Sequence, residues 1–276
     1  QTFPLTAQGP GGSMLVQRSI TVNTTPTPPT VDTFAASPAE IRPGTDAMLS
    51  WTTSLATTVE ITAVPADAGL PASFSADGSV AVSPAVTTTY TITATNTHGN
   101  DTDTAMVTVT ALAAGDLIIS EIMIDAATDP AGEWFEIHNP GTMQANLDGL
   151  TFDSSTGESF TVDTEVLVAG GGYALFAATD NATDNDHLPA IDYVYSGLTF
   201  ATGGGGDELS VSDGATLIDD VTWTAAWTTT TGYSFSLTSL SAADNDTFAN
   251  WCDSGNMWTG ATSSYGSPGE AHDACD

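Results

Sequence analysis

Residues 88–110 read TTYTITATNTHGNDTDTAMVTVT, and this stretch decides the fold. Apolar and polar residues alternate from Tyr90 to Ala94 and again toward Val109, and Gly99 lies between the two runs. A period of two residues is typical of a β-strand with one buried face, and a glycine between two such runs indicates a turn. The stretch therefore predicts the last two strands of a β-sandwich.

The first 23 residues resemble this stretch at a constant offset. Thr2 aligns with Thr89, 87 positions later, and Gly12 aligns with Gly99 without a gap. Residues 1–23 are therefore predicted to be the last two strands of a similar domain whose earlier strands are absent. A two-stranded ribbon is at best marginally stable alone, so other backbone has to cover its apolar face. The apolar residues of this assembly hairpin are Phe3, Leu5, Leu15, Ile20 and Val22.

A short linker, TTPTPPT at residues 24–30, separates the hairpin from residues 31–112. Its prolines favour a stiff, extended chain. Residues 31–112 continue the alternation in short runs between turn residues, which indicates an all-β sandwich. The motifs F-x-x-S-P at residues 34–38 and S-P-x-x-TTTYTITA at 83–94 make this part similar to the bacterial Ig-like repeats of surface proteins. Trp51 is expected to be a core residue.

Residues 113–276 form a second predicted unit with several separated motifs. IISEIM opens it at residues 118–123, EWFEIHNPG follows at 133–141, and YGSPG stands at 265–269. Their order and spacing resemble the lamin-tail domain, an Ig-like sandwich, over residues 116–270. The resemblance implies a structural or accessory module without shared catalytic residues, and a fold alone does not fix function. The predicted fold class is all-β, with two tandem Ig-like β-sandwiches preceded by an unpaired β-hairpin.

The charge of the chain excludes two classes of partner. The sequence holds 34 acidic residues, two arginines and no lysine, for a formal net charge of −32. Nucleic acids and anionic membrane surfaces are bound through Lys and Arg, so neither is an expected partner. No apolar run is long enough to cross a bilayer, and membrane insertion is not expected. Such an acidic surface needs counter-ions, supplied by bulk salt or by bound divalent cations.

The best candidate for a bound cation is the acidic run DNATDND at residues 180–186. Its closely spaced oxygen ligands suit a hard cation, so Asp180, Asp184 and Asp186 are candidate calcium ligands. The run is not an EF-hand, because the glycine and the closing glutamate are missing. The alternative is a solvated acidic loop, and calcium is the one cofactor that the sequence suggests.

The sequence offers no arrangement of residues that predicts catalysis. The four histidines are isolated, and neither a G-x-S-x-G nor an H-E-x-x-H motif occurs. Glu133 and Glu136 flank Trp134 and Phe135, so an alternating strand places the two carboxylates on opposite faces. A general acid and base would have to converge. We therefore expect a protein that is not an enzyme.

Cys252 and Cys275 are the only cysteines. Metal sites usually need more ligands than two, so the pair predicts one disulfide near the C-terminus and an oxidising compartment. The alternative is two free thiols in a reducing cytosol. Together with the acidic composition, the disulfide favours a secreted, extracellular protein at a cell surface.

Three explanations compete for residues 1–23. In the first, the sequence is cut at a boundary within a longer tandem array. In the second, the hairpin folds back on its own chain, and in the third it adds its strands to a neighbouring molecule. Strand addition applied head to tail does not close and makes a filament of identical copies. We predict such an extracellular filament subunit. The alternative is an accessory, binding or spacer module at the end of a large bacterial surface adhesin or secreted hydrolase.

Overall fold

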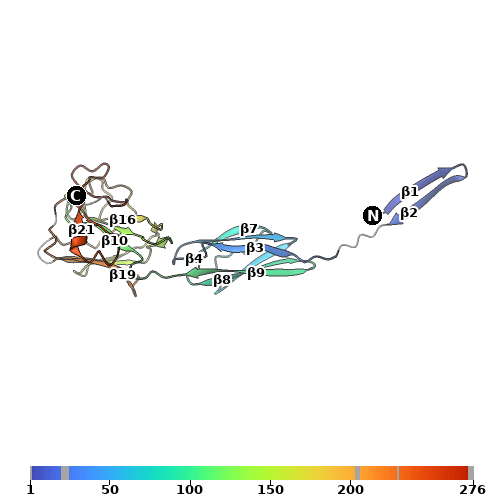
Figure 1. Ribbon diagram of the computed structural model, residues 1–276, viewed down its shortest axis with the longest axis horizontal. Helices are drawn as coiled ribbons and strands as arrows, with labels where there is room; N and C mark the ends of the chain where they lie inside the picture. Colours follow the sequence, from blue (N-terminus) through green and yellow to red (C-terminus); the bar gives the residue numbers. More distant parts are fainter. Residues whose placement is uncertain (1, 20–24, 203–205, 229, 273–276) are drawn as a thin grey trace.

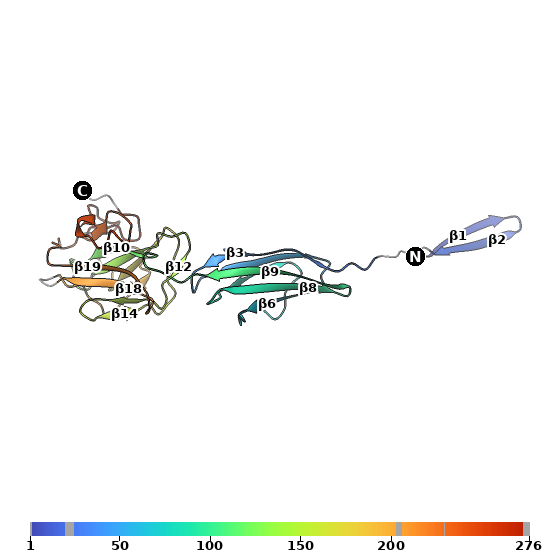
Figure 2. The ribbon, with the colours of Figure 1, turned by 60° about the horizontal axis from the view of Figure 1, so that its bottom comes forward.

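The computed structural model describes residues 2–19, 25–202, 206–228 and 230–272, which form three parts along the long axis of the molecule (Figure 1). The regular elements in these residues are β-strands apart from one short 3-10 helix at Phe248–Asn250. A hairpin is followed by one β-sandwich and then by a second, which carries the C-terminus (Figure 2). The predicted all-β fold class is confirmed.

The hairpin has the register that the internal repeat predicts. Strand β1 (Thr2–Gly9) pairs antiparallel with β2 (Gly12–Ser19), from Thr2 opposite Ser19 to Gly9 opposite Gly12. The corresponding strands of the next part pair Thr89 with Met106, which is the same register moved by 87 positions. The similarity between the two segments therefore extends to how the strands pair. Of the predicted assembly residues, Ile20 and Val22 lie outside the described residues.

The first sandwich, as we call strands β3 to β9, has two sheets with alternating burial. In β5 the residues Ala47, Leu49 and Trp51 are buried, whereas those between them are exposed. Trp51 is 4% exposed and its Nε1 donates to the carbonyl of Ser75 at 3.1 Å, so its predicted core position is confirmed. One sheet has the strand order β3 (Thr30–Ser37), β5 (Ala47–Ser54), β7 (Gly78–Val82). The other has the order β4 (Glu40–Ile41), β9 (Gly99–Val109), β8 (Thr88–Asn96), β6 (Thr58–Val64).

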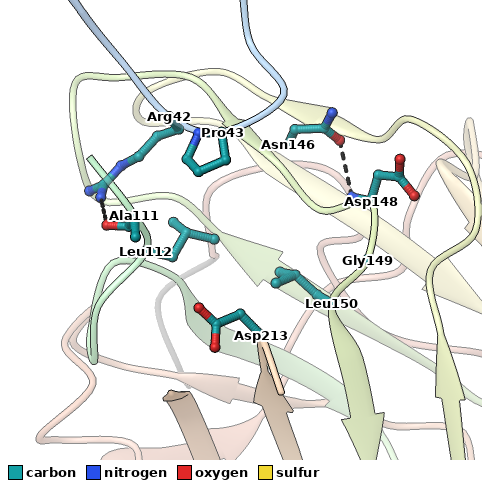
Figure 3. Close-up of a pocket in the computed structure, with 9 residues that line it drawn as sticks. All are labelled: Arg42, Pro43, Ala111, Leu112, Asn146, Asp148, Gly149, Leu150 and Asp213. Carbon is teal, nitrogen blue, oxygen red and sulfur yellow. Dashed lines mark hydrogen bonds between the residues drawn. The ribbon is translucent and has the colours of Figure 1, made fainter. Parts of the chain in front are cut away.

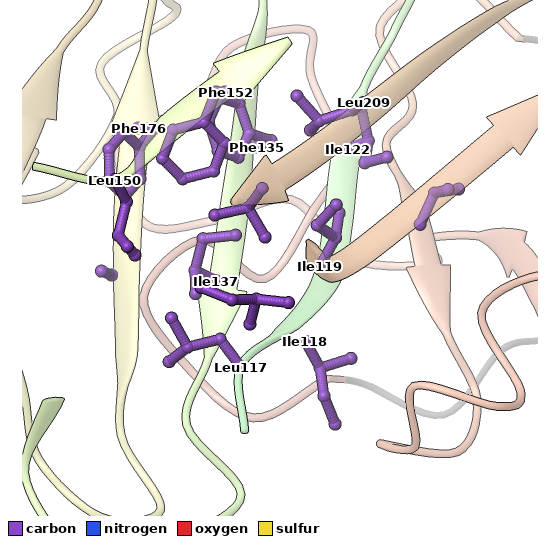
Figure 4. Close-up of a cluster of buried hydrophobic side chains, with 14 of the residues drawn as sticks. Leu117, Ile118, Ile119, Ile122, Phe135, Ile137, Leu150, Phe152, Phe176 and Leu209 are labelled. Carbon is purple, nitrogen blue, oxygen red and sulfur yellow. The ribbon is translucent and has the colours of Figure 1, made fainter. Parts of the chain in front are cut away.

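The second sandwich, strands β10 to β21, is built around a six-stranded and a four-stranded sheet. Its core is rich in aromatic rings, and Phe135 stacks on Phe176 with ring centres 4.9 Å apart and contacts Phe152 at 5.1 Å (Figure 4). The six-stranded sheet runs β17 (Tyr193–Val194), β16 (Tyr173–Ala177), β11 (Trp134–His138), β10 (Ile118–Met123), β20 (Phe235–Leu237), β21 (Trp251–Asp253). The four-stranded sheet runs β14 (Ser159–Thr161), β13 (Thr151–Asp153), β18 (Asp207–Ser212), β19 (Leu217–Trp223), and β12 (Ala145–Asn146) pairs with β15 (Leu167–Val168).

Strands β10 and β11 are buried on both faces along their whole length. One face packs into the aromatic core. On the other face, Met123 and Trp134 are neighbours across the strands and pack against Trp258 of the C-terminal segment. This segment, residues 251–272, therefore covers the outer face of the central sheet. Polar side chains on that face are buried beneath it.

The two sandwiches meet at a short junction built around Arg42. Its guanidinium pairs with Asp116 at 2.9 Å and donates to the carbonyl of Ala111. Gly44 has a φ of +74°, and a Cβ there would lie 2.7 Å from Nδ2 of Asn146, which donates to the Gly44 carbonyl. Beside these contacts lies a cavity of about 250 Å³ (Figure 3). The junction thus uses the one cationic side chain that follows the hairpin in the sequence.

Candidate functional site

The N-terminal hairpin exposes apolar side chains on both of its faces. Met14 and Leu15 are adjacent in β2, so they point to opposite faces, and they are 66% and 58% exposed. In the first sandwich the corresponding positions hold the polar residues Asp101 and Thr102. At these two positions the hairpin exposes apolar side chains where its counterpart has polar ones.

Among the described residues the hairpin pairs with no further strand, unlike its counterpart in the first sandwich. In the first sandwich β8 lies between β6 and β9, and β9 lies between β4 and β8. The inward side chains of β8, Tyr90, Ile92 and Ala94, are each 0% exposed. At the 87-residue offset these positions correspond to Phe3, Leu5 and Ala7. The hairpin therefore has core-type residues in its sequence, but within the described part of the chain it has no flanking strands.

The acidic loop does not bring its three predicted calcium ligands together around one point. Asp186 turns its carboxylate to the loop at residues 262–264 and accepts hydrogen bonds from the backbone amides of Thr262, Ser263 and Ser264. Asp184 accepts from the side-chain amide of Asn181 at 2.7 Å, and Asp180 is exposed. In this arrangement Asp186 ties two loops of the second sandwich together, and calcium binding by the loop stays a prediction.

The hydrogen bonds to Asp186 also affect its charge. Burial tends to raise the pKa of this carboxyl, but the donors from Thr262, Ser263 and Ser264 outweigh burial and hold the pKa far below its ordinary value. Asp186 is therefore ionised at neutral pH and at pH values well below it.

The structure brings together three chemically active side chains that the sequence analysis did not connect. Glu121 of β10 lies directly opposite Glu136 of β11, and His272 reaches both from the end of the described chain. One ligand atom from each of the three lies within 4.8 Å of those from the others. Glu121 and Glu136 are both fully buried. We call these three residues the buried carboxylate cluster.

The two carboxylates of the cluster differ in their protonation. Burial raises the pKa of Glu136 well above its ordinary value, and the charge of Glu121 raises it further. Burial acts in the same direction on Glu121, but the hydrogen bond and charge of His272, with further donors, lower its pKa below the ordinary value. Two carboxylates in one buried place behave in this way because both cannot be ionised without a compensating cation.

The predicted separation of Glu133 and Glu136 is confirmed. The carboxylate of Glu133 accepts from the backbone amide of Phe200 at 3.1 Å, whereas that of Glu136 faces Ser120 and Gly269. Burial raises the pKa of Glu133 to about 9. The partner that Glu136 meets is instead Glu121, 15 positions earlier, and only the pairing of β10 with β11 could have indicated this.

The predicted disulfide falls partly outside the described residues. Cys252 lies in β21, within the six-stranded sheet, and Cys275 belongs to the residues that the structure does not describe. The Cys252–Cys275 bond therefore stays a prediction. Among the described residues, no helix has the length and apolar character that crossing a membrane requires.

A comparison with known protein families supports the lamin-tail resemblance. Residues 110–225 match the family model of the Lamin Tail Domain, which confirms the resemblance over that range. The resemblance of residues 31–112 to bacterial Ig-like repeats stays a prediction, as does a bacterial origin. No curated protein matches the chain.

Several solved structures are similar to the chain at low identity. The titin domains Z1Z2 in complex with telethonin are 18% identical, with 72% of this chain and 95% of that chain covered and a TM-score of 0.26. An alpha-2-macroglobulin from Escherichia coli is 11% identical, covering 80% and 19%, with a TM-score of 0.27. A DUF4876 family protein from Bacteroides thetaiotaomicron is 12% identical, covering 72% and 59%, with a TM-score of 0.25.

Proposed function

We propose that the chain is a structural subunit of an extracellular filament. The hairpin of one copy adds its strands to a sheet of the next copy, and repetition of this contact in one direction builds the fibre. The role needs no catalysis. Covalent crosslinks through lysine side chains cannot join the subunits, since the sequence contains no lysine. The proposed contacts between subunits are non-covalent.

The observation that carries this proposal is a hairpin with a core-type sequence that pairs with no further strand among the described residues. Its register equals that of β8 and β9, and the inward residues Tyr90, Ile92 and Ala94 of β8 are completely buried. The exposed side chains of Met14 and Leu15 add apolar surface that favours a partner. A backbone ribbon with two open edges and an apolar face gains hydrogen bonds and burial when it joins a sheet.

The acceptor in this proposal is an edge of the second sandwich. The first sandwich already holds β8 and β9 at the positions that the hairpin would take. Edge strands of the second sandwich are β14 and β19 in one sheet, and β17 and β21 in the other. A head-to-tail contact between the N-terminal hairpin and the C-terminal sandwich agrees with the extended arrangement of the chain (Figure 1).

One observation favours a second candidate function. A constant 87-residue offset, with the same register in both copies, is typical of tandem repeats within one chain. In that case the hairpin completes an Ig-like repeat formed by other residues of a longer surface protein. The chain is then a spacer or binding module rather than a polymer subunit.

Electron microscopy of negatively stained, purified full chain separates the two candidates. The filament proposal expects fibres, and it expects them to disappear when residues 1–23 are deleted. The variant Leu5→Asp should have the same effect, because Leu5 corresponds to the buried Ile92. Thr6→Asp is the matched control, since Thr6 is an exposed neighbour in the same strand.

Two results would contradict the filament. Fibres that persist after the deletion would remove strand addition by the hairpin. Single particles of the full chain at all protein concentrations would remove the filament itself and support the tandem-repeat candidate.

A further inference from the structure

The buried carboxylate cluster is composed of residues from three distant parts of the sequence. Glu121 and Glu136 face each other across β10 and β11, on the outer face of the central sheet that residues 251–272 cover. Like charges directly opposite each other on antiparallel strands are destabilising. The pair is therefore a costly arrangement unless a positive charge or a proton lies between the two side chains.

No cationic side chain of Lys or Arg is available to supply that charge. The sequence contains two arginines, Arg18 and Arg42, and neither belongs to the second sandwich. Arg42 pairs with Asp116 at the junction. Buried carboxylates normally have a paired charge or bind a metal ion. The remaining candidates near Glu121 and Glu136 are His272 and a cation from solution.

His272 closes the cluster on the side of the C-terminal segment. Its side chain is 7% exposed, and Nδ1 lies 3.4 Å from Oε2 of Glu121 and 3.3 Å from Oγ of Ser267. Nε2 is buried and has no hydrogen-bond partner among the described residues. His272 thus makes two long contacts through Nδ1 and, within the described chain, none through Nε2, although buried polar atoms are normally paired.

The other atoms around the cluster hold its carboxylates in fixed positions. Oε1 of Glu121 accepts from the hydroxyl groups of Ser234 and Ser254 and from the amide of Ser267. Oε2 accepts from Oγ of Ser267 at 2.8 Å and faces His272. Glu136 accepts from Ser120 Oγ at 3.0 Å and from the amide of Gly269 at 2.6 Å. Hydrogen bonds of this kind orient the ligands of a metal ion.

Gly266 is required for this close approach. A Cβ at this position would lie 2.8 Å from the Trp134 ring and 3.0 Å from both Oε1 of Glu121 and Oγ of Ser234. Any larger residue would push the C-terminal segment away from the sheet and open the cluster. The backbone is therefore shaped so that Ser267, Gly269 and His272 all reach the two carboxylates.

We propose that Glu121, Glu136 and His272 bind a divalent cation of the Zn²⁺ type, which fastens the C-terminal segment to β10 and β11. Two carboxylate oxygens and one imidazole nitrogen form a ligand set that suits Zn²⁺. Ligands at about 2.1 Å in a tetrahedral arrangement lie about 3.4 Å apart, which equals the separation of Glu121 Oε2 and His272 Nδ1. The fourth position is left to water or to the hydroxyl group of Ser267.

The competing explanation is that a proton on Glu136 neutralises the pair. This state requires no metal and predicts that the three side chains serve only to dock the C-terminal segment. The two explanations differ in one measurable quantity, the affinity of the folded chain for the metal ion.

The test uses the full chain, stripped of metal with a chelator and titrated with Zn²⁺ in a calorimeter and in thermal unfolding. We expect one tight site per chain and a rise in the unfolding temperature on adding Zn²⁺. Glu136→Gln and His272→Ala should each weaken this binding at least tenfold. Glu133→Gln is the matched control, because Glu133 is equally buried but faces Phe200 rather than the cluster. It should bind Zn²⁺ like the wild type.

His272→Ala keeps the proposal testable should Glu136→Gln fail to fold, since His272 lies at the edge of the C-terminal segment. Binding Co²⁺ in place of Zn²⁺ gives a second measurement, because the visible absorption of Co²⁺ depends on the number and type of its ligands. Absence of a tight site in the wild type would overturn the proposal. Equal affinity in the wild type, Glu136→Gln and His272→Ala would overturn it as well, because the metal would then be bound by other carboxylates.

Discussion

The two sandwiches bury their strands in different ways. In β5 of the first sandwich, Ala47, Leu49 and Trp51 face the core and the residues between them face water. In β10 and β11 of the second sandwich every residue is buried, because residues 251–272 cover the outer face. Polar residues of the first sandwich can therefore be solvated. Those on β10 and β11 have to find partners inside the protein.

The charge distribution makes this difference sharper. The second sandwich buries Glu121, Glu133, Glu136 and Asp219 without a single Lys or Arg. In the first sandwich Asp32 is an exposed carboxylate whose hydrogen bonds from Ser54 and Thr30 lower its pKa. The buried Glu133, Glu136 and Asp219 thus have raised pKa values, whereas the pKa of the exposed Asp32 is lowered. A second covered face turns ordinary acidic residues into groups that need a proton, a dipole or a cation.

The largest expected effect separates the stabilities of the two sandwiches. Phe135→Ala removes a buried ring that packs against Phe152 and Phe176, and it should lower the free energy of unfolding of the second sandwich by about 3–5 kcal/mol. Differential scanning calorimetry should show the unfolding transition of the second sandwich at a lower temperature and that of the first sandwich unchanged. Trp51→Ala should do the reverse. A joint shift of both transitions in either variant would show that the sandwiches unfold as one unit.

The next effect is a loss of stability with rising pH, and it is expected in the second sandwich. Burial raises the pKa of Asp219 to about 7 from an ordinary value of 3.8, against the effect of hydrogen bonds from Ile119 and Asn245. The folded state therefore keeps a proton that the unfolded chain loses near pH 4. The free energy of unfolding should fall as pH rises from about 4 to about 7, by about 2–4 kcal/mol.

Melting curves between pH 4 and pH 8 measure this dependence. Asp219→Asn should make this dependence shallower without abolishing it, because the amide does not titrate whereas Glu133 and Glu136, whose pKa values are also raised, still do. The exposed Asp32 of the first sandwich has a lowered pKa, so its contribution has the opposite sign and is lost as pH falls. A wild-type second sandwich whose stability rises through the same pH range would contradict the assignment of Asp219.

The smallest expected effect tests the acidic loop of the second sandwich. If Asp180, Asp184 and Asp186 bind calcium, a concentration ten times the dissociation constant should stabilise the second sandwich by about 1.4 kcal/mol. Sodium at equal ionic strength should produce a smaller rise in melting temperature, and the first sandwich should respond equally to both salts. Equal responses of the second sandwich to calcium and sodium would show that the loop is merely solvated.

Much of the fold could be predicted from sequence because the signals are local. Alternation from Tyr90 to Ala94 predicts a strand with one buried face, and the structure buries these inward residues completely. The 87-residue offset predicts a hairpin with the register that β1 and β2 adopt. Motifs such as IISEIM at residues 118–123 indicate the lamin-tail resemblance, which the family comparison confirms over residues 110–225. Each of these features depends on neighbours along the chain.

The sequence by itself determined the strand pattern, the excess of negative charge and the separation of Glu133 from Glu136, since all three follow from composition and spacing. Only the tertiary structure decided that Glu121, Glu136 and His272 meet. The physical reason is that cross-strand register and the path of a covering segment depend on packing between residues far apart in the chain. For the same reason Asp186 could be recognised as an acidic loop residue, but its binding to residues 262–264 could not.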